Sequence, residues 1–506
     1  MEERIMTRKT ADNLLKDPYR PGYHFAAFAA DGRPGDPNGA FYADRRYHLM
    51  YLYREEAEDA FHWGHISSTD LLHWRNHPDA LGSDEGDRGC FSGGAFVDDD
   101  QTAYLTFWKF ASKDGKDPGG IDIAYSRPPY DEWKRLRPLA IPGSREIWGT
   151  KDIEVGGKLR HVGCADPSNI WKENGIYYMQ TGNLCVLNAY GREAGSDPFY
   201  QGDWVDLFRS KDLKNWEYVD RFYQNPHSGE DWPDATEDDM CPSYLPLFDK
   251  PKNGAPTGKM LQLFIAHNKG TQYYVGHQEG ERFIPESHGR MSWVDNSFFA
   301  PEALIDGENR HIAWCWLQDN LPDDFGKFGW SGVYTFPRVL WLEGDELRMA
   351  PAEELDRLMI NGERFLIGEQ KEAQKIVLRN PASFRLKAEI AMNNAREAGF
   401  VVRKSEDGKE FCRISVNAEE KKLVMELSHS GKNIREAAPF EIRGGKVKLD
   451  IFVDQSVVEV YADDRQGIAR RIYPTSPEKS LGVESLGTGA DYGEVSTWEM
   501  MPTNAY

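Results

Sequence analysis

The 506-residue sequence is poor in cysteine and contains no long apolar run. Its six cysteines are scattered, without a CxxC pair or a histidine at metal-ligand spacing: Cys90, Cys164, Cys185, Cys241, Cys315 and Cys412. This pattern predicts reduced, buried thiols rather than disulfides or a zinc site. No stretch reaches the roughly 18 apolar residues that a membrane-spanning helix needs, so we expect no membrane partner.

Positive charge is also scarce, because 61 Lys and Arg residues are outnumbered by 82 Asp and Glu residues, for a formal net charge of −21. Such a surface repels nucleic acid and anionic lipid, which excludes both as expected partners. Residues 1–25 contain no apolar segment typical of a secretion signal, so the expected location is cytoplasmic. An enzyme in that compartment would act on substrates small enough to be imported.

Helical periodicity is rare in this sequence. Short runs rich in Tyr, Phe, Trp, Val and Ile recur instead, for example at residues 40–53, 102–108, 168–180 and 260–267. Several of these runs contain a polar break between two β-like halves, which is typical of a hairpin. Many short strands without intervening helices predict an all-β fold.

A weak internal repeat refines this prediction. Residues 68–74 and 210–216 share the pattern S-x-D-L-x-x-W, and each copy follows a strand-like run. One supersecondary unit that is used repeatedly is typical of the blades of a β-propeller. We expect the Asp and Trp of each copy to close a turn and to pack between blades.

The pattern changes near residues 350–365. Residues 350–359 favour one short helix, after which strands with alternating apolar and polar residues resume. These strands are predicted at residues 384–392, 399–403, 411–416, 423–427, 447–453 and 456–461. A period of two residues is typical of sheets with one buried face, so this region is predicted to be a β-sandwich.

Three acidic positions stand in settings that give a side chain a defined direction. Asp36 precedes the tight-turn sequence P-N-G at 37–39, Asp166 precedes a strand, and the acidic cluster 237–239 precedes an apolar run. Each of these, taken singly, is typical of a surface turn or a solvated loop. Together they suit a retaining glycoside hydrolase, which needs a nucleophile and an acid/base on opposite sides of the scissile bond.

The order and the flanks of these segments resemble the invertase–levanase–inulinase family, glycoside hydrolase family thirty-two. D-P-N-G at 36–39 is similar to the end of the family's W-M-N-D-P-N-G, F-H-W-G-H-I-S at 61–67 continuing to Trp74 to its W-G-H-x-x-S-x-D-L-x-x-W, and F-S-G-G-A at 91–95 to its F-S-G-S-A. A-D-P at 165–167 stands where the family has R-D-P, and E-D-D-M-C-P at 237–242 is similar to its E-D-x-x-C-P, a variant of E-C-P. In the second domain, L-D-I-F-V-D-Q-S-V-V-E-V-Y at 449–461 is similar to the family's L-x-I-F-x-D-x-S-x-V-E-V-F. The resemblance spans about residues 20–500, in family order.

The resemblance implies a five-bladed β-propeller over residues 20–350, a short helical linker over 351–365 and a β-sandwich over 366–503. It also implies roles for three carboxyl groups. Asp36 would be the nucleophile that forms a covalent furanosyl-enzyme, and Asp166 would stabilise the transition state.

The acid/base of such an enzyme is predicted to come from the acidic cluster. Glu237 is the first candidate by the resemblance. Asp239 is the next candidate, because it shares a face with Glu237 if the strand is regular, and Asp238 is the third. The acid/base needs a raised pKa, which desolvation and the negative charges of Asp36 and Asp166 would give it.

The implied activity is cleavage of a furanoside, most simply a fructofuranoside, and the expected partner is that furanoside or a small oligosaccharide. No metal ion and no cofactor are needed for this mechanism. Self-association through the sandwich stays open. The residues predicted to bind substrate are Asn38, Trp63, Phe91, Ser92 and Trp108.

Three departures from the family pattern predict an altered pocket. R-P-G at 33–35 replaces W-M-N, Ala165 replaces the Arg of R-D-P, and Glu237 lies four residues before Cys241 rather than beside it. An aromatic ring, an amide and a guanidinium fork are thus missing from their expected places. We therefore expect sucrose to be a poor substrate.

Two other functions fit the same residues. A furanosyl transferase would use the same intermediate but deliver the sugar to another hydroxyl group, and product analysis separates the two activities. A non-catalytic carbohydrate-binding protein would keep the scaffold without turnover, and an activity screen on aryl furanosides identifies it.

Overall fold

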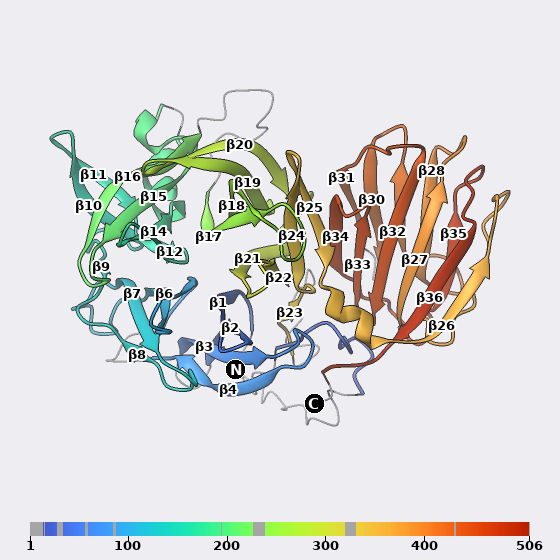
Figure 1. The fold of residues 1–506 in the computed structure, drawn as a ribbon, viewed down its shortest axis with the longest axis horizontal. Helices are drawn as coiled ribbons and strands as arrows, with labels where there is room; N and C mark the ends of the chain where they lie inside the picture. The colour runs from blue at the N-terminus through green and yellow to red at the C-terminus, as the bar shows by residue number, and fades with distance from the viewer. Residues whose placement is uncertain are drawn as a thin grey trace, which may run out of the picture. The chain divides into compact units, whose positions relative to one another are not determined.

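The computed structural model of the protein describes residue 14 and residues 16–27, 34–55, 59–83, 88–193, 195–225, 238–318, 330–429 and 432–504. Regular structure in these residues is almost entirely β-strand, as the sequence predicts (Figure 1). The chain divides into two compact units, the first made of residues 28–290 and 299–316, and the second of residues 1–27, 291–298 and 317–506. None of the described helices is long and apolar enough to cross a lipid bilayer.

The first unit is a succession of antiparallel sheets in which strands that follow one another in the chain pair (Figure 1). The first sheet contains β1 (Pro37–Ala43), β2 (Arg46–Glu55), β3 (Ala60–Ser68) and β4 (Arg75–Leu81). The second contains β5 (Ala95–Val97), β6 (Ala103–Lys109) and β7 (Gly120–Ser126), and β7 also pairs with β8 (Lys134–Arg135) and β9 (Ile141–Pro142). Such meanders are the repeating unit of a β-propeller.

The next sheets repeat this pattern. The third contains β12 (Ala165–Pro167), β14 (Ile176–Gly182), β15 (Asp203–Ser210) and β16 (Trp216–Asn225), with β13 (Trp171–Glu173) beside β14. The hairpin of β10 (Thr150–Val155) and β11 (Lys158–Gly163) precedes it, and α2 (Leu184–Val186), a π-helical turn (Leu187–Gly191) and a 3₁₀ turn (Pro198–Tyr200) lie between β14 and β15. The fourth contains β17 (Met240–Phe248), β18 (Pro256–Ala266), β19 (Gly270–Glu279) and β20 (Arg282–Arg290), and β21 (Phe298–Ile305) and β22 (His311–Leu317) follow.

The two copies of S-x-D-L-x-x-W connect the third and fourth strands of their sheets. Asp70 Oδ1 accepts hydrogen bonds from the backbone N–H groups of Leu72 (3.0 Å) and His73 (2.9 Å). Asp212 Oδ1 likewise accepts from the N–H groups two and three residues later, at 2.9 and 2.8 Å. The repeat therefore marks a turn that recurs between outer strands, as expected from the sequence.

The second unit contains the predicted sandwich (Figure 1). Before it lie β23 (Val333–Tyr334), the hairpin of β24 (Arg338–Glu343) and β25 (Glu346–Pro351), and a 3₁₀ helix (Glu353–Leu358). One sheet has the order β26 (Met359–Leu366), β36 (Glu494–Met500), β27 (Ser383–Ala391), β32 (Lys446–Asp454), β33 (Val457–Ala462) and β34 (Gln466–Arg471). The other has the order β31 (Lys432–Pro439), β30 (Lys422–His429), β29 (Phe411–Asn417), β28 (Glu397–Lys404) and β35 (Gly482–Leu486). Alternate residues of these strands form one apolar core.

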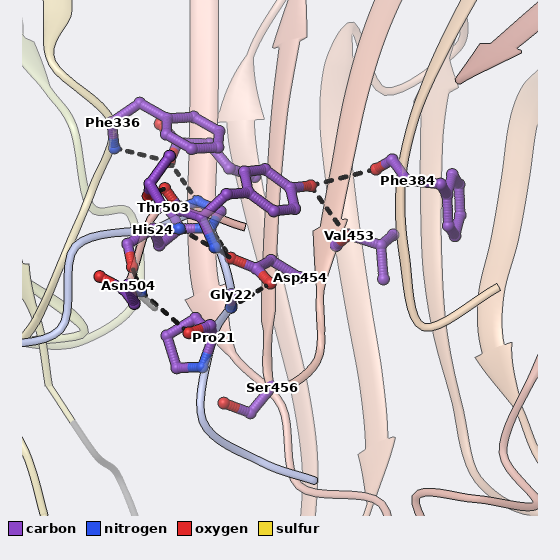
Figure 2. A network of polar contacts seen from close by, with 12 residues as sticks. Pro21, Gly22, His24, Phe336, Phe384, Val453, Asp454, Ser456, Thr503 and Asn504 are labelled. Carbon is purple, nitrogen blue, oxygen red and sulfur yellow. Dashed lines mark hydrogen bonds and ion pairs between the residues drawn. The ribbon is translucent and has the colours of Figure 1, made fainter. Parts of the chain in front are cut away.

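Residues 21–24 of the second unit bind at the turn between β32 and β33 (Figure 2). The Asp454 carboxylate accepts hydrogen bonds from the backbone N–H groups of Gly22 (2.7 Å), Tyr23 (2.8 Å) and His24 (2.7 Å). The Tyr23 hydroxyl donates to the carbonyl oxygen of Val453 at 2.8 Å. One buried carboxylate thus attaches the N-terminal segment to the sandwich.

We expect Asp454→Ala to destabilise the second unit by about 3–5 kcal/mol, because three N–H groups and the His24 ring lose their acceptor. Burial lowers the pKa of His24, but hydrogen bonds to Asp454 and Glu459 raise it above the usual value overall. The His24 contribution is therefore fully present below the pKa of the unfolded histidine, and it is lost as the pH rises through the folded pKa. Urea unfolding, with the exposed turn variant Asp407→Ala as control, should show a larger loss at acidic than at alkaline pH. A loss no larger than that of the control would contradict this role.

Candidate active site

Asp36 lies in the turn that leads into β1. Its Oδ2 accepts a hydrogen bond from the Ser92 hydroxyl at 2.7 Å, and its side chain is buried. The carbonyl oxygen of Asp36 accepts from the Asn38 side-chain amide at 3.0 Å and from the backbone N–H of Leu52 at 2.9 Å. These bonds fix the turn from both sides and give the Asp36 carboxylate a single direction.

Asn38 and Trp63, which are predicted to bind substrate, connect the Asp36 turn to residues 91–93. Asn38 Oδ1 accepts a hydrogen bond from the Gly93 N–H at 3.0 Å. Trp63 is 0% exposed, and its Nε1 donates to the carbonyl oxygen of Phe91 at 3.2 Å. A Cβ at Gly39, whose φ is +54°, would lie 3.0 Å from the Trp63 ring, so glycine is required there. Both side chains thus have partners within the protein, and their contact with substrate stays a prediction.

The F-S-G-G-A segment lies between the two acidic motifs. A Cβ on Gly93 would lie 2.0 Å from the carbonyl oxygen of Thr106, and one on Gly94 would lie 2.4 Å from the backbone nitrogen of Asn169. Asn169 is three residues beyond Asp166. The two glycines therefore allow the backbone approach that brings Ser92 to Asp36 beside the strand of Asp166.

Asp166 lies in β12, in the left-handed region with φ of 37°. Its Oδ2 accepts a hydrogen bond from Cys241 Sγ at 3.5 Å, and its buried Oδ1 has no hydrogen-bond partner among the residues that the structure describes. Burial, followed by the negative charge of Asp36, raises the pKa of Asp166 to about 7. Burial also raises the pKa of Asp36, but the Ser92 hydrogen bond acts in the opposite direction. The two carboxyl groups are thus close enough to interact electrostatically, and the Ser92 hydrogen bond favours the ionised form of Asp36.

Glu237 lies outside the described residues, which resume at Asp238. Four residues after Glu237, the Cys241 side chain contacts Asp166, and burial and the charges of Asp166 and Asp36 raise the pKa of its thiol. The segment that follows the acidic cluster therefore contacts the site of the other two carboxylates.

The alternative acid/base candidates have protein partners. Asp238 accepts hydrogen bonds from the His267 backbone N–H at 3.0 Å and from its Nδ1 at 2.6 Å. Asp239 is 0% exposed and accepts from the Tyr223 hydroxyl at 2.6 Å, while its own N–H donates to the Asn183 side chain at 2.7 Å. These contacts orient Asp239 into the protein interior.

Sequence reasoning missed three side chains at this site. Burial lowers the pKa of His267, but Asp238, Asp166 and Asp36 raise it above the usual value, so these carboxylates favour the protonated ring. Trp316 lies beside Gly35, where a Cβ would stand 3.5 Å from its ring. Glu302 is buried, accepts a hydrogen bond from the Ala40 N–H at 2.8 Å and has a pKa well above its usual range because of burial. Neither a motif nor a periodic pattern in the sequence marks these three residues as parts of the site.

Phe91 is partly exposed and Trp108 is 3% exposed, and their rings meet edge to face at 5.9 Å. Among the predicted site residues that the structure describes, Ser92 donates to Asp36, Asp166 interacts electrostatically with Asp36, and Trp108 packs against Phe91. No group of three or more His, Cys, Asp or Glu side chains that could hold a metal ion occurs within the described ranges.

Comparison with known proteins identifies the family of the chain. The family model of the "Glycosyl hydrolases family 32 N-terminal domain" matches residues 27–351, and that of the "Glycosyl hydrolases family 32 C terminal" matches residues 354–499. A levanase from Bacillus subtilis (strain 168) is 29% identical over 514 residues, covering 93% of this chain and 69% of the levanase. A sucrose-6-phosphate hydrolase from Zymomonas mobilis is 25% identical over 516 residues, covering 98% of this chain and 95% of the relative.

Among solved structures, fructan 1-exohydrolase IIa from Cichorium intybus superposes with a TM-score of 0.77 at 20% identity, covering 96% of this chain and 98% of that one. Fold and site together define the class of the protein as a glycoside hydrolase. The chain belongs to glycosyl hydrolases family 32, since the two family models match almost its whole length. The prediction of a five-bladed β-propeller followed by a β-sandwich is confirmed.

Proposed function

We propose that this protein is a retaining hydrolase of fructofuranosides, with Asp36 as nucleophile, Glu237 as acid/base and Asp166 as the stabiliser of the transition state. The observation that carries the proposal is the buried pair of Asp36 and Asp166, in which the Ser92 hydroxyl donates a hydrogen bond to Asp36 at 2.7 Å and so favours the ionised form of the proposed nucleophile. The names of the relatives support the choice of sugar. Solved relatives include a fructan 1-exohydrolase in complex with 1-kestose and a β-fructofuranosidase in complex with sucrose.

In the first step, the Asp36 carboxylate attacks the anomeric carbon of the furanose while Glu237 gives its proton to the leaving oxygen. The bond to the leaving group breaks and a fructosyl ester of Asp36 forms. In the second step, Glu237 takes a proton from water, which attacks the same carbon and releases Asp36. Asp166 binds the ring hydroxyl groups as positive charge develops on the sugar.

The charge balance of this pocket differs from the family pattern, because Ala165 stands where an arginine is expected. We propose that His267 supplies the missing positive charge. Its Nδ1 is held by Asp238 at 2.6 Å, and its ring interacts electrostatically with both Asp36 and Asp166. A histidine offers one donor in place of the planar fork of an arginine, so fewer substrate hydroxyl groups are fixed at this point.

A panel of substrates tests the function. Sucrose, sucrose 6-phosphate, inulin- and levan-type oligosaccharides, an aryl β-fructofuranoside and an aryl arabinofuranoside are incubated with the protein, and released sugars are separated by chromatography. We expect free fructose from the fructosides, with sucrose among the slowest, and no arabinose. If no fructoside releases fructose, the protein is a non-catalytic carbohydrate-binding protein. If transfer products appear in place of fructose, the protein is a furanosyl transferase.

Replacement of Ser92 by alanine tests the ionisation of the nucleophile. Without the 2.7 Å hydrogen bond, the pKa of Asp36 rises further, so the acidic limb of the pH profile of kcat/KM moves to higher pH. The rate at neutral pH should fall roughly 10–100-fold, since a hydrogen bond to a charged group is lost. Ser68→Ala removes a comparable bond to Asp70, in the turn between β3 and β4, and serves as control. An unchanged acidic limb in Ser92→Ala would show that Asp36 is not the group that titrates.

A further inference from the structure

One aromatic side chain of the propeller unit is open to solvent. Trp148 is 49% exposed, although the rings around it are largely buried. Its ring stacks on that of Trp108, with 4.0 Å between centroids and 30° between planes, and on that of Phe110, with 5.4 Å and 21°. Two rings thus cover one face of the Trp148 indole, and its exposed area comes from the remaining face and edges.

The Trp148 stack is attached to the Asp36 side of the site. Trp108 meets Phe91 edge to face at 5.9 Å, and the backbone N–H of Phe91 donates to the carbonyl oxygen of Trp108 at 2.7 Å. The residue after Phe91 is Ser92, which binds Asp36 at 2.7 Å. The Trp148 stack therefore packs against the segment, Phe91 and Ser92, that binds the proposed nucleophile.

The same stack is attached to the Asp166 side. The carbonyl oxygen of Gly149, the residue after Trp148, accepts a hydrogen bond from the N–H of Cys164 at 2.9 Å, two residues before Asp166. A Cβ on Gly149, whose φ is +73°, would lie 2.9 Å from the Trp108 ring and 2.4 Å from Cys185 Sγ. Burial, followed by the negative charge of Asp166, raises the pKa of the Cys185 thiol. Trp148 is thus held on a backbone that packs tightly next to both acidic residues.

We propose that the open face of Trp148 is a binding subsite for the leaving-group side of an oligofructoside. The proposal rests on the proposed function, in which the furanose that is cleaved lies between Asp36 and Asp166. Both carboxylates are buried, so the rest of the substrate must extend outward, and Trp148 is an exposed ring on the segments that hold these carboxylates. A flat, rigid ring with one covered face binds the apolar face of a sugar with little loss of conformational entropy. We therefore expect a trisaccharide or a longer chain to gain more from Trp148 than a disaccharide does.

Trp148→Leu tests this subsite, because leucine keeps an apolar cover over Trp108 but removes the flat face. We expect kcat/KM for 1-kestose and longer inulin-type oligosaccharides to fall roughly 3–10-fold, mainly through KM, and kcat/KM for an aryl β-fructofuranoside to stay within about twofold. Trp148→Phe should retain more of the oligosaccharide activity. Leu159→Ala, which trims an exposed apolar side chain of β11, is the matched control and should change neither substrate.

Calorimetric titration of 1-kestose into Asp36→Ala, with and without Trp148→Leu, measures the same subsite without turnover, and the Leu variant should bind several-fold more weakly. An equal loss of kcat/KM on aryl and oligosaccharide substrates would show that Trp148 only supports packing. Unchanged kcat/KM and unchanged affinity for all substrates would show that sugars do not bind to the face of Trp148. Absence of wild-type activity on the aryl fructoside is a different result, because it contradicts the proposed function itself and leaves the calorimetric comparison to decide on the subsite.

Discussion

Replacement of Asp36 by alanine is expected to lower kcat for every fructoside by about 10⁴-fold or more, because the covalent route through the fructosyl ester is lost. The loss should be similar for aryl and natural substrates, since both form the same intermediate. Steady-state release of fructose measures the effect. Added azide should restore part of the turnover of the aryl fructoside and give a product of inverted configuration, because a small anion fits the space of the missing carboxylate.

The fold of the Asp36→Ala protein must be preserved for this result to count. Circular dichroism and thermal unfolding check this, and Asp99→Ala, at an exposed hairpin tip, controls for loss of an aspartate that carries no catalytic role. A decrease of less than tenfold in Asp36→Ala would remove Asp36 from the catalytic mechanism.

Glu237→Ala is expected to slow the cleavage of oligosaccharides by about 10³-fold, because their leaving groups need a proton. The first step on an aryl fructoside should change far less, since an activated phenol leaves without protonation. The ratio of kcat/KM values for the two substrate types is the measurement. A burst of phenol followed by slow turnover is also expected, because water then lacks a general base.

Asp238→Asn and Asp239→Asn are the matched comparisons for Glu237→Ala. Asp238 holds His267 at 2.6 Å, so its variant should weaken substrate binding without a dependence on the leaving group. Asp239 binds Tyr223 at 2.6 Å in the interior, so its variant should chiefly lower stability. A strong dependence on the leaving group in either variant, with none in Glu237→Ala, would assign the acid/base to that aspartate.

Much of the fold could be predicted from periodicity. The strands expected at 447–453 and 456–461 are observed as β32 (Lys446–Asp454) and β33 (Val457–Ala462), because alternation survives wherever one sheet face is buried. The expected hairpin in 40–53 turns at Asp44 and Arg45, both with positive φ, as a two-residue turn requires. The helical segment at residues 184–191 was not predicted, because it is too short to show a period.

The candidate site was only partly predictable. Motif order placed Asp36, Ser92 and Asp166 together, since each stands next to a turn or glycine that fixes its backbone. The same motifs could not tell a buried ring from an open one. Trp63 and Trp108 are buried, and exposure depends on neighbours from distant segments. Trp148 illustrates this, because its position over Trp108 arises only when a turn packs on strand β6, which lies about forty residues earlier in the chain.

The covalent attachment of the sugar is the step on which this mechanism depends. Glu237→Ala mixed with an aryl β-fructofuranoside, quenched in acid and digested with a protease, should yield one peptide heavier by a fructosyl residue, and fragmentation should place the added mass on Asp36. Fructose released without any labelled peptide and with inverted configuration, or a label on Asp166, would contradict the account.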